Sequence, residues 1–529
     1  MSTEDINKVV VTLHKGVDVD AFIEEMNGLG NVSPYVPERA VEIYNLKEDS
    51  LRNVDFVLTR NEMEELRKDP RVLACRWGTK AENGMIAEPY SLDASRQYTR
   101  TNTYLPGNVD MPWQLLNTYK TTNQYTTSTN VSYAAKYTAL GAGVDFIIQD
   151  TGLQVDHPEF TDSNGVSRVQ QIDWYNETGI PGSMPANFYT DTYGHGTHCA
   201  GTAAGKYYGF AKESLIYVMT ILSDSINANV PISQSFNLIR QWHLNKTPTS
   251  TGYIRPTVVN MSWGYRISIS AVTGGVYRGT PWSGSAPQNS YGVITGNGSM
   301  PIIVDSVQAD VDDCLDAGVI MIGASGNNRY KIDVPGGLDY NNIVYYGDAT
   351  PYYYMRGSTP TANPDIMKIG AVALQNNPEK KATFSCTGPG VPFYIGGDYI
   401  QSSCSTVNVF EGSTYPVANY SFNPSYKVAK ISGTSMASPG AAGLACVLLG
   451  SRPWYTQNKV TQWLSDVCIS NRLQDNNNGY ADPISLQGGP NKVMYNPWVA
   501  GSFPTVIQHT SPAQVDQSPE FTATLHGKF

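Results

Sequence analysis

The sequence predicts an α/β protein in which helices cover both faces of a mostly parallel sheet, preceded by a small α+β unit. Three observations support this fold class. Apolar strand-like runs recur from residue 144 onward, helical segments separate several of them, and the first 80 residues alternate strands and helices in a pattern of their own. Continuously apolar runs are typical of strands buried on both faces, and intervening helices connect parallel strands.

Residues 1–80 are expected to form a β-α-β-β-α-β unit of the ferredoxin-like kind. One helix is expected over 18–30, with Asp18 as its N-cap, and a second helix begins at a capping-box pattern formed by Thr59 and Glu62. The four strand candidates are KVVVTL (8–13), AVEIYNL (40–46), NVDFVLT (53–59) and RVLACRW (71–77).

The rest of the chain divides by composition into a linker with the expected processing region (81–110), a main domain (111–497) and a C-terminal extension (498–529) that lacks a core pattern. A Gly/Ser/Tyr-rich insertion spans 265–306. Strands of the main sheet are expected at 144–150, 215–221, 257–264, 319–327 and 365–372, with helices at 235–244 and around 312–318. Sites in such sheets gather at the carboxyl ends of strands, where Asp150, Gly264 and Asn327 lie.

Composition excludes several classes of function. A net charge of −10 argues against nucleic-acid binding, and the absence of an apolar run of about 18 residues argues against a membrane span. The polar N-terminus lacks signal-peptide features, so we expect synthesis in the cytoplasm, with release by lysis or carriage on a particle such as a virion left open. Seven cysteines without a CxxC pair favour free thiols over disulfides or a zinc site.

Three short motifs contain the residue types needed for nucleophilic catalysis. They are Asp150-Thr151-Gly152, GHGTH (194–198) and GTSMASP (433–439). A serine becomes a useful nucleophile when an imidazole accepts its proton and an acid orients that imidazole. The serine motif precedes a long helix of small residues, and a helix N-terminus favours a developing oxyanion.

In sequence order these motifs run Asp, His, Ser, which is the order in subtilisin, and the chain resembles the subtilases, most of all their proteinase K branch. The resemblance extends from Pro112-Trp113 to Asn496. Its most specific segments are DTGLQVDHPEF (150–160), GHGTHCAGTAAGKYYGFAKES (194–214), VVNMSWG (258–264), ASGNN (324–328), IGAVALQNNPEKKATFSCTGPG (369–390), SGTSMASPGAAGLA (432–445) and GGPNKVMYN (488–496).

The resemblance implies a serine endopeptidase that acts through an acyl-enzyme, and it implies a role for each matching residue. Asp150 would orient the imidazolium, His195 would be the general base and then the acid, Ser435 would be the nucleophile, and Asn327 would donate to the oxyanion. The residues implied in substrate binding are Ser262, Trp263 and Gly264 along a pairing strand, and Ala324, Ser325 and Gly326 along a pocket wall that would admit a large apolar side chain.

The N-terminal unit resembles the inhibitor-type propeptide of the same proteases, most clearly in FVLTRNEMEELRKDPRVLACR (56–76). The resemblance implies that this unit assists folding, lies on the main domain and sends its C-terminal end into the cleft until a bond within 78–105 is cut. The expected partners are therefore polypeptide substrates and the chain's own propeptide, with no nucleic acid and no membrane. A catalytically silent or permanently inhibited binding protein of this fold stays open as the alternative.

Some positions depart from the family pattern. The loop AAGKYYG (203–209) is short where a calcium-binding loop would lie. Ala373 stands where the proteinase K branch has an aspartate, so the best-known calcium sites of the family are not expected here. No cofactor is expected for catalysis, and structural calcium remains unassigned. Gly440 stands where a histidine commonly follows the serine motif, so altered packing is expected there.

Two rival protease classes fit the sequence poorly. A zinc protease would place two histidines at i and i+4 with an intervening glutamate, whereas His195 and His198 are three apart without one. An aspartic protease needs two paired aspartates, and the second candidate, Asp316, lies at an expected helix end. We therefore expect no metal site, a structural His198, and a free Cys199 beneath the site that the resemblance implies is sensitive to mercurials.

Overall fold

The computed structural model describes residues 7–28, 30, 33–46, 50–77, 86–89, 112–119, 136–137, 139–224, 228–250, 252–284, 291–294, 298–346, 350–374, 378–413, 416–476, 479 and 482–500. Apart from residues 86–89, the expected processing region lies outside these ranges, and so does the expected C-terminal extension apart from residues 498–500. No helix in the described ranges has both the length and the apolar character needed to cross a bilayer.

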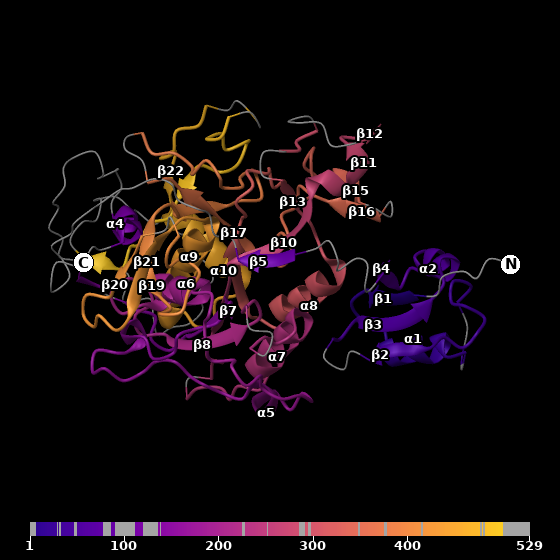
Figure 1. The fold of residues 1–529 in the computed structure, drawn as a ribbon, viewed down its shortest axis with the longest axis horizontal. Coiled ribbons are helices and arrows are strands. Elements are labelled where there is room, and N and C mark those ends of the chain that lie inside the picture. The colour runs from indigo at the N-terminus through magenta and orange to yellow at the C-terminus, as the bar shows by residue number, and fades with distance from the viewer. Residues whose placement is uncertain are drawn as a thin grey trace.

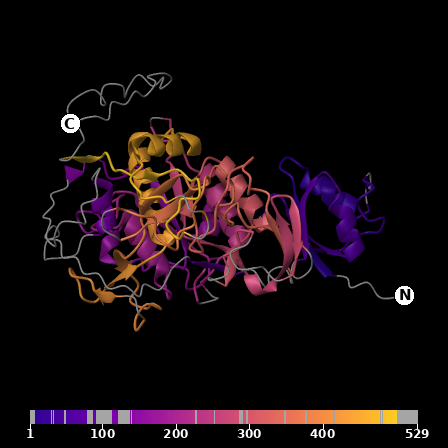
Figure 2. The ribbon, with the colours of Figure 1, turned by 90° about the horizontal axis from the view of Figure 1, so that it is seen from above.

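The N-terminal residues form a separate unit beside the rest of the molecule (Figures 1 and 2). Its elements are β1 (Asn7–Leu13), α1 (Val19–Met26), β2 (Ile43–Leu46), β3 (Asn53–Leu58), α2 (Arg60–Leu66) and β4 (Val72–Trp77). The antiparallel sheet has the order β2-β3-β1-β4, so the predicted β-α-β-β-α-β pattern is confirmed. Both expected caps are present: Asp18 accepts from the Ala21 N–H, and Thr59 with Glu62 forms the capping box.

The main domain is built on a sheet whose described strands have the order β22-β23-β18-β17-β14-β9-β7-β8. All neighbours are parallel except β22 with β23. The bounds are β7 Asp145–Asp150, β8 Leu215–Thr220, β9 Thr257–Met261, β14 Ile320–Ala324, β17 Met367–Val372, β18 Phe393–Gly396, β22 Ile469–Ser470 and β23 Lys492–Val493. The predicted α/β class with a mostly parallel sheet is confirmed.

Side-chain alternation shows that helices cover both faces of this sheet. Gln149 and Asp150 are neighbours in β7 and therefore point to opposite faces. Asp150 contacts His195 in α6 (His195–Ala204), whereas Gln149 donates to Ser235 in α7 (Ile232–Leu244). Every residue of β7, β9, β14 and β17 is buried, as strands covered on both faces must be.

The longest helix, α9 (Thr434–Ser451), crosses the middle of the sheet and packs beside α6. On the opposite face α7 packs against α8 (Asp305–Asp316). The remaining helices and 3₁₀ turns are α4 (Trp113–Tyr119), η1 (Pro158–Phe160), α5 (Trp174–Thr178), η2 (Ile269–Ala271) and α10 (Gln457–Val467). A smaller antiparallel sheet has the order β19-β21-β20, with bounds Ile400–Cys404, Lys427–Ile431 and Val417–Asn419.

The expectation of one strand over 257–264 is wrong in detail. The chain leaves β9 after Met261, passes Ser262, and enters β10 (Trp263–Ser268), which belongs to a different sheet of order β13-β10-β5. Strand β13 is Ser299–Pro301 and β5 is Ile86–Pro89. The polar residues Asn260 and Ser262 interrupt this run, but neither is a turn signal that marks the change of sheet.

The expected insertion (265–306) contributes two strands to a four-stranded sheet. Its strands β11 (Val272–Tyr277) and β12 (Thr280–Ser283) pair with β15 (Ile343–Tyr346) and β16 (Thr350–Tyr353) in a sheet of order β12-β11-β15-β16. The last two strands come from a segment after residue 330 that the sequence analysis did not connect with the insertion. Near the C-terminus, β24 (Val499–Ala500) pairs with β6 (Lys136–Tyr137).

The altered packing expected at Gly440 has a specific cause. A side chain at Gly440 would meet the amide of Gln114 at 2.8–3.0 Å. Gln114 lies in α4 and is fully buried, and its Nε2 donates to the carbonyls of Gly396 and Met436 at 2.5 and 2.7 Å. The glutamine therefore fills the space that a residue larger than glycine would take at position 440 of α9, five residues after Ser435.

Candidate active site

The Asp150 carboxylate lies at the carboxyl end of β7, fully buried. Its Oδ1 is 2.7 Å from Nδ1 of His195 and accepts from the Thr151 N–H at 2.8 Å. A carboxylate can only accept, so Nδ1 of His195 carries the proton in this bond. In the neutral imidazole Nε2 is then the atom with a free lone pair, as a general base requires.

His195 is brought to Asp150 by two glycines at the start of α6. Gly194 has φ +91°, a left-handed conformation that glycine adopts without strain. A Cβ at Gly196 would lie 2.2 Å from the Gly152 carbonyl and 3.2 Å from Cβ of Asp150. The GHG sequence is therefore what allows the helix to approach the end of β7.

Asp191 supports this arrangement, and the sequence analysis missed it. Its Oδ2 accepts from the N–H and hydroxyl of Thr197, while Oδ1 accepts from the Gly194 N–H and the Thr151 hydroxyl. One buried carboxyl thus joins the first turn of α6 to the loop after β7, and burial raises its pKa. An acidic residue just before a helix start was the available signal.

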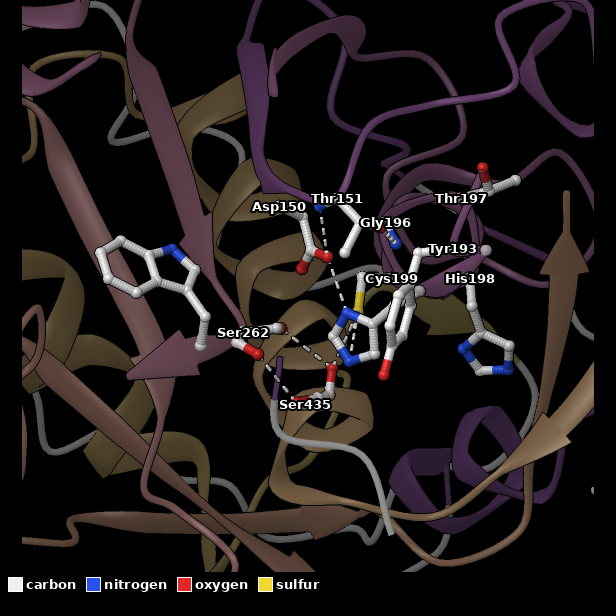
Figure 3. Close-up of polar contacts among 12 residues, drawn as sticks. Asp150, Thr151, Tyr193, Gly196, Thr197, His198, Cys199, Ser262 and Ser435 are labelled. Atoms are coloured by element: carbon white, nitrogen blue, oxygen red, sulfur yellow. Dashed lines mark hydrogen bonds and ion pairs between the residues drawn. The ribbon is translucent and has the colours of Figure 1, made fainter. Parts of the chain in front are cut away.

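His198 points away from the Asp150 carboxylate (Figure 3). Its Nε2 lies 2.9 Å from the Ile400 carbonyl and 3.1 Å from the Ala429 carbonyl, so it carries a proton and donates to them. Burial lowers the pKa of His198 to about 3, which keeps the ring neutral. This histidine ties α6 to β19 and β21 and takes no part in a histidine pair.

Ser435 lies in the first turn of α9, buried, with its hydroxyl donating to the Ser262 carbonyl at 2.9 Å. Cys199 connects it to the histidine, because Sγ lies 3.3 Å from the Ser435 carbonyl and 3.7 and 4.0 Å from the two ring nitrogens of His195. Figure 3 shows Asp150, Cys199 and Ser435 converging from β7, α6 and α9. The structure therefore brings the three motif residues together in one buried cluster.

Asn327 is held in one orientation by Thr434. Its Oδ1 accepts from both the N–H and the hydroxyl of Thr434, each at 2.9 Å. The Nδ2 group of Asn327 is buried and has no partner among the described residues. An unsatisfied buried donor costs about 1–3 kcal/mol, so its persistence beside Ser435 points to a group that it will bind.

Ser262 and Trp263 have different surroundings. The Ser262 hydroxyl donates to the Ser435 carbonyl at 3.0 Å and accepts from Asn260. The indole of Trp263 is fully buried and donates to Gln149, so only its backbone is available to a ligand. Gly264 is buried in the same strand and lies opposite Glu88 of β5.

Ala324 ends β14, and Ser325 and Gly326 follow toward Asn327. Ala324 and Ser325 are buried, and the Gly326 N–H donates to the Thr434 hydroxyl at 3.1 Å. Gly326 has φ +102°, which a residue with a side chain would adopt only with strain. These small residues immediately precede Asn327, and Gly326 contacts the same threonine, Thr434, that holds the Asn327 side chain.

The chain's own strand β5 lies antiparallel to β10, immediately beyond Ser262. Pro89 is opposite Trp263, Glu88 opposite Gly264, Ala87 opposite Tyr265 and Ile86 opposite Arg266. Figure 1 shows β5, which comes from the linker after the N-terminal unit, against β10 of the main domain. The sequence analysis gave no strand at 86–89.

Metal-ligating atoms were sought among the described residues. Asp150, His195 and Cys199 place one potential ligand atom each within 4.8 Å of one another. Burial raises the pKa of Cys199 well above its usual range, so the thiol is protonated and a poor ligand. Ala373 is buried and supplies no side-chain oxygen to a calcium ion. The short loop carries Lys206, whose ammonium donates to the Asp162 carbonyl.

The chain is similar to several known proteins. Residues 141–483 match the model of the Subtilase family. A cuticle-degrading serine protease of Arthrobotrys oligospora is 26% identical over 69% of this chain and 64% of its own length. An alkaline protease 1 of Aspergillus clavatus is 26% identical over 70% and 64%. The solved structure of a cold adapted subtilisin-like serine proteinase is 21% identical, covering 73% of this chain and 99% of that one, with a TM-score of 0.45.

Proposed function

Because the chain belongs to the subtilase family, we propose that it is a serine endopeptidase that cuts peptide bonds with Ser435, His195 and Asp150. The chain spans less than two thirds of the length of the curated relatives named above, 64% in each case. The observation that carries the proposal is the buried 2.7 Å contact between His195 and Asp150 beside Ser435.

The proposed reaction begins when the Ser435 hydroxyl turns from the Ser262 carbonyl to Nε2 of His195. His195 takes the proton as Oγ attacks the substrate carbonyl carbon, and Asp150 stabilises the imidazolium through Nδ1. The tetrahedral oxyanion accepts from Nδ2 of Asn327 and from the Ser435 N–H at the start of α9. His195 then gives its proton to the leaving amine, and water hydrolyses the resulting ester.

Thr434 and Asp191 act through other residues in this scheme. Thr434 fixes the amide of Asn327 so that Nδ2, and not Oδ1, faces the reacting carbonyl. Asp191 fixes the first turn of α6 relative to Asp150. Neither touches the substrate, so both are positioning residues.

The contacts of the N-terminal unit support a zymogen in which this unit inhibits the main domain. Arg52 pairs with Asp313 at 3.0 Å and donates to the Ala309 carbonyl at 2.6 Å, and Arg76 pairs with Asp305 at 2.6 Å. These contacts hold the unit on α8, while β5 occupies the edge of β10 beside Ser435. A substrate pairing with that edge would have to displace β5.

A serine-directed fluorophosphonate and a casein assay test the proposal. We expect the wild-type chain to be labelled on Ser435 and to hydrolyse casein once the N-terminal unit is removed, and we expect the Ser435→Ala variant to do neither. A folded wild-type chain that is neither labelled nor active would instead support the silent binding protein. Labelling and casein hydrolysis by the main domain after removal of the N-terminal unit, with neither in the full chain at any time, would indicate permanent inhibition by that unit.

A further inference from the structure

Strand β5 shows the direction in which a polypeptide crosses the active site. It runs antiparallel to β10, and its last residue, Pro89, is opposite Trp263, the first residue of β10. A polypeptide that pairs with β10 in this way approaches Ser262 with its carboxyl end leading. The Ser262 carbonyl accepts from Oγ of Ser435 at 2.9 Å. Substrate residues before the scissile bond therefore lie along β10, and residues after it lie beyond Ser435.

Tyr193 lies on the side of Ser435 that faces away from β10. In Figure 3 Ser435 is placed between Ser262 and Tyr193. Tyr193 precedes His195 by two residues and is only partly buried, and its ring meets that of Phe410 edge-on, with the centroids 6.0 Å apart. A substrate that continues past Ser435 from β10 therefore meets Tyr193.

The loop after β19 packs against the same turn. The Val409 N–H donates to the Tyr193 carbonyl at 3.1 Å. A Cβ at Gly194 would lie 2.6 Å from Cβ of Asn408, so the loop contacts the residue that precedes His195. This loop thus extends the wall of the active site beyond Tyr193.

Hydrogen bonds hold the loop in place. The Ser405 hydroxyl donates to the Asp191 carbonyl at 2.6 Å, and the Thr406 N–H donates to Oε1 of Gln154 at 2.9 Å. Oδ1 of Asn408 accepts from two backbone N–H groups of the loop itself, at 3.0 and 2.9 Å. A surface that is already ordered loses little conformational entropy when a ligand binds, so its contacts contribute to affinity.

The loop presents apolar side chains to solvent. Val407 is 63% exposed and Val409 is 44% exposed. The charged residue of the loop, Glu411, pairs with Lys427 at 3.4 Å. An apolar substrate side chain would remove the two valines from water, whereas a carboxylate placed against them would lose hydration.

We propose that Tyr193, Val407 and Val409 receive the part of a polypeptide substrate that follows the scissile bond, and that they favour an apolar residue there. The proposal rests on the proposed function, because that bond is cut by Ser435. The three residues touch the leaving segment and none of the reacting atoms, so they determine specificity.

Acyl transfer measures this side of the site alone. The active enzyme, after release of its N-terminal unit, is given a peptide ester that has no residue after its scissile bond, together with a dipeptide amide. The amine attacks the carbonyl carbon of the acyl-enzyme in place of water, and its proton passes through His195 to Oγ of Ser435 as the ester bond breaks. The ratio of amide product to acid product is independent of the rate at which the acyl-enzyme forms.

We expect this ratio to be about 10-fold higher with Leu-Leu-amide than with Asp-Asp-amide in the wild type. Val407→Asp and Val409→Asp should each remove most of that preference, and Val407→Lys should raise the ratio for Asp-Asp-amide about 5-fold. Val166→Asp is the matched control and should keep the wild-type preference. Val166 is 62% exposed and leads to Val169, which bridges to Ile216 at the end of the sheet opposite the active site.

The outcomes separate this inference from the proposed function. Fluorophosphonate labelling of Ser435 first shows that each variant is folded. A labelled enzyme with equal ratios for the two dipeptide amides overturns the inference and leaves the peptidase intact. The same holds if Val166→Asp loses the preference as Val407→Asp does, or if Val407→Asp and Val409→Asp both keep it. A folded chain with neither labelling nor ester hydrolysis overturns the proposed function itself.

Discussion

Two buried polar regions of the molecule are built in opposite ways. At the contact between the N-terminal unit and α8, buried charged groups are paired, as Arg52 is with Asp313. At the active site, Nδ2 of Asn327 and Oδ2 of Asp150 are buried without a partner among the described residues. An unpaired buried group lowers stability. In the proposed reaction, the oxyanion of the substrate would supply the partner of the Asn327 amide. The ion pair of Arg52 and Asp313 holds the N-terminal unit on α8, whereas the unpaired amide of Asn327 is available to bind a ligand.

A large effect is expected from removing the unpaired amide of Asn327. Asn327→Ala should lower kcat about 10²- to 10³-fold, because one oxyanion donor is lost, with little change in KM. The matched control is Asn328→Ala, which removes contacts to Ser299 from the neighbouring position and touches no reacting group. Steady-state kinetics on the processed enzyme measure both. Equal losses in the two variants would mean that the free amide of Asn327 has no special role.

The next effect concerns the paired region. Arg52→Ala should weaken binding of the cleaved N-terminal unit about 100-fold, since it leaves Asp313 buried and unpaired. Lys15→Ala removes a contact to Asp316 in which both side chains are at least half exposed, so it should have little effect. Dilution of the cleaved complex, followed by recovery of peptidase activity, gives the dissociation constants. A larger effect of Lys15→Ala would contradict the assignment of affinity to the buried pair.

A smaller effect is expected beneath the nucleophile, where Gln114 and Gly440 compete for one space. Gly440→Ala should destabilise the fold by about 1–3 kcal/mol through overpacking, and Gln114→Ala should relieve that cost in the double variant. Gly443→Ala is the control, because its Cβ would meet the Ala203 carbonyl at 2.5 Å and the glutamine change cannot relieve it. Thermal unfolding of each variant, made in the Ser435→Ala background, measures these changes in stability. If the destabilisations of Gln114→Ala and Gly440→Ala simply add in the double variant, the two side chains do not compete for the same space.

The last effect is a change in how the free energy of unfolding depends on pH. Burial lowers the pKa of Lys368 to about 7, and its amine donates to the carbonyls of Asn363 and Ile366. Between pH 7 and its ordinary pKa the unfolded chain binds the extra proton, so stability rises with pH by up to about 1.4 kcal/mol per unit from this group. Lys368→Met should remove that rise, and Lys68→Met, which changes an exposed lysine, should not. Chemical denaturation between pH 7 and 10 provides the measurement.

The sequence was sufficient to predict the sheet class, the N-terminal fold and the motifs whose residues Asp150, His195 and Ser435 come together in the structure. These depend on local patterns: apolar runs, caps and glycine-rich turns. It was not sufficient to predict that Thr434 would orient Asn327, or that Asp191 would join two loops. Such contacts depend on which side chains meet in three dimensions, and single residues of these types carry no pattern.

Long-range strand pairing was the other gap. β5 comes from a stretch without periodicity, and its place beside β10 is decided by an open sheet edge far along the chain. The sheet shared by β11 and β15 likewise joins segments separated by more than 60 residues. Register between such distant segments is set by packing on the folded domain and leaves no local signal in either strand.

The central claim is that Ser435 is a nucleophile activated by His195 and Asp150, and fluorophosphonate labelling mapped by mass spectrometry tests it most directly. We expect the label on Ser435 in the processed wild-type chain, a rate about 10⁴-fold lower in Asp150→Asn, and none in Ser435→Ala. Thr161→Ala, which removes a hydroxyl that only bonds the Pro158 carbonyl, should label at the wild-type rate. Label on another serine, or an undiminished rate in Asp150→Asn, would contradict the account.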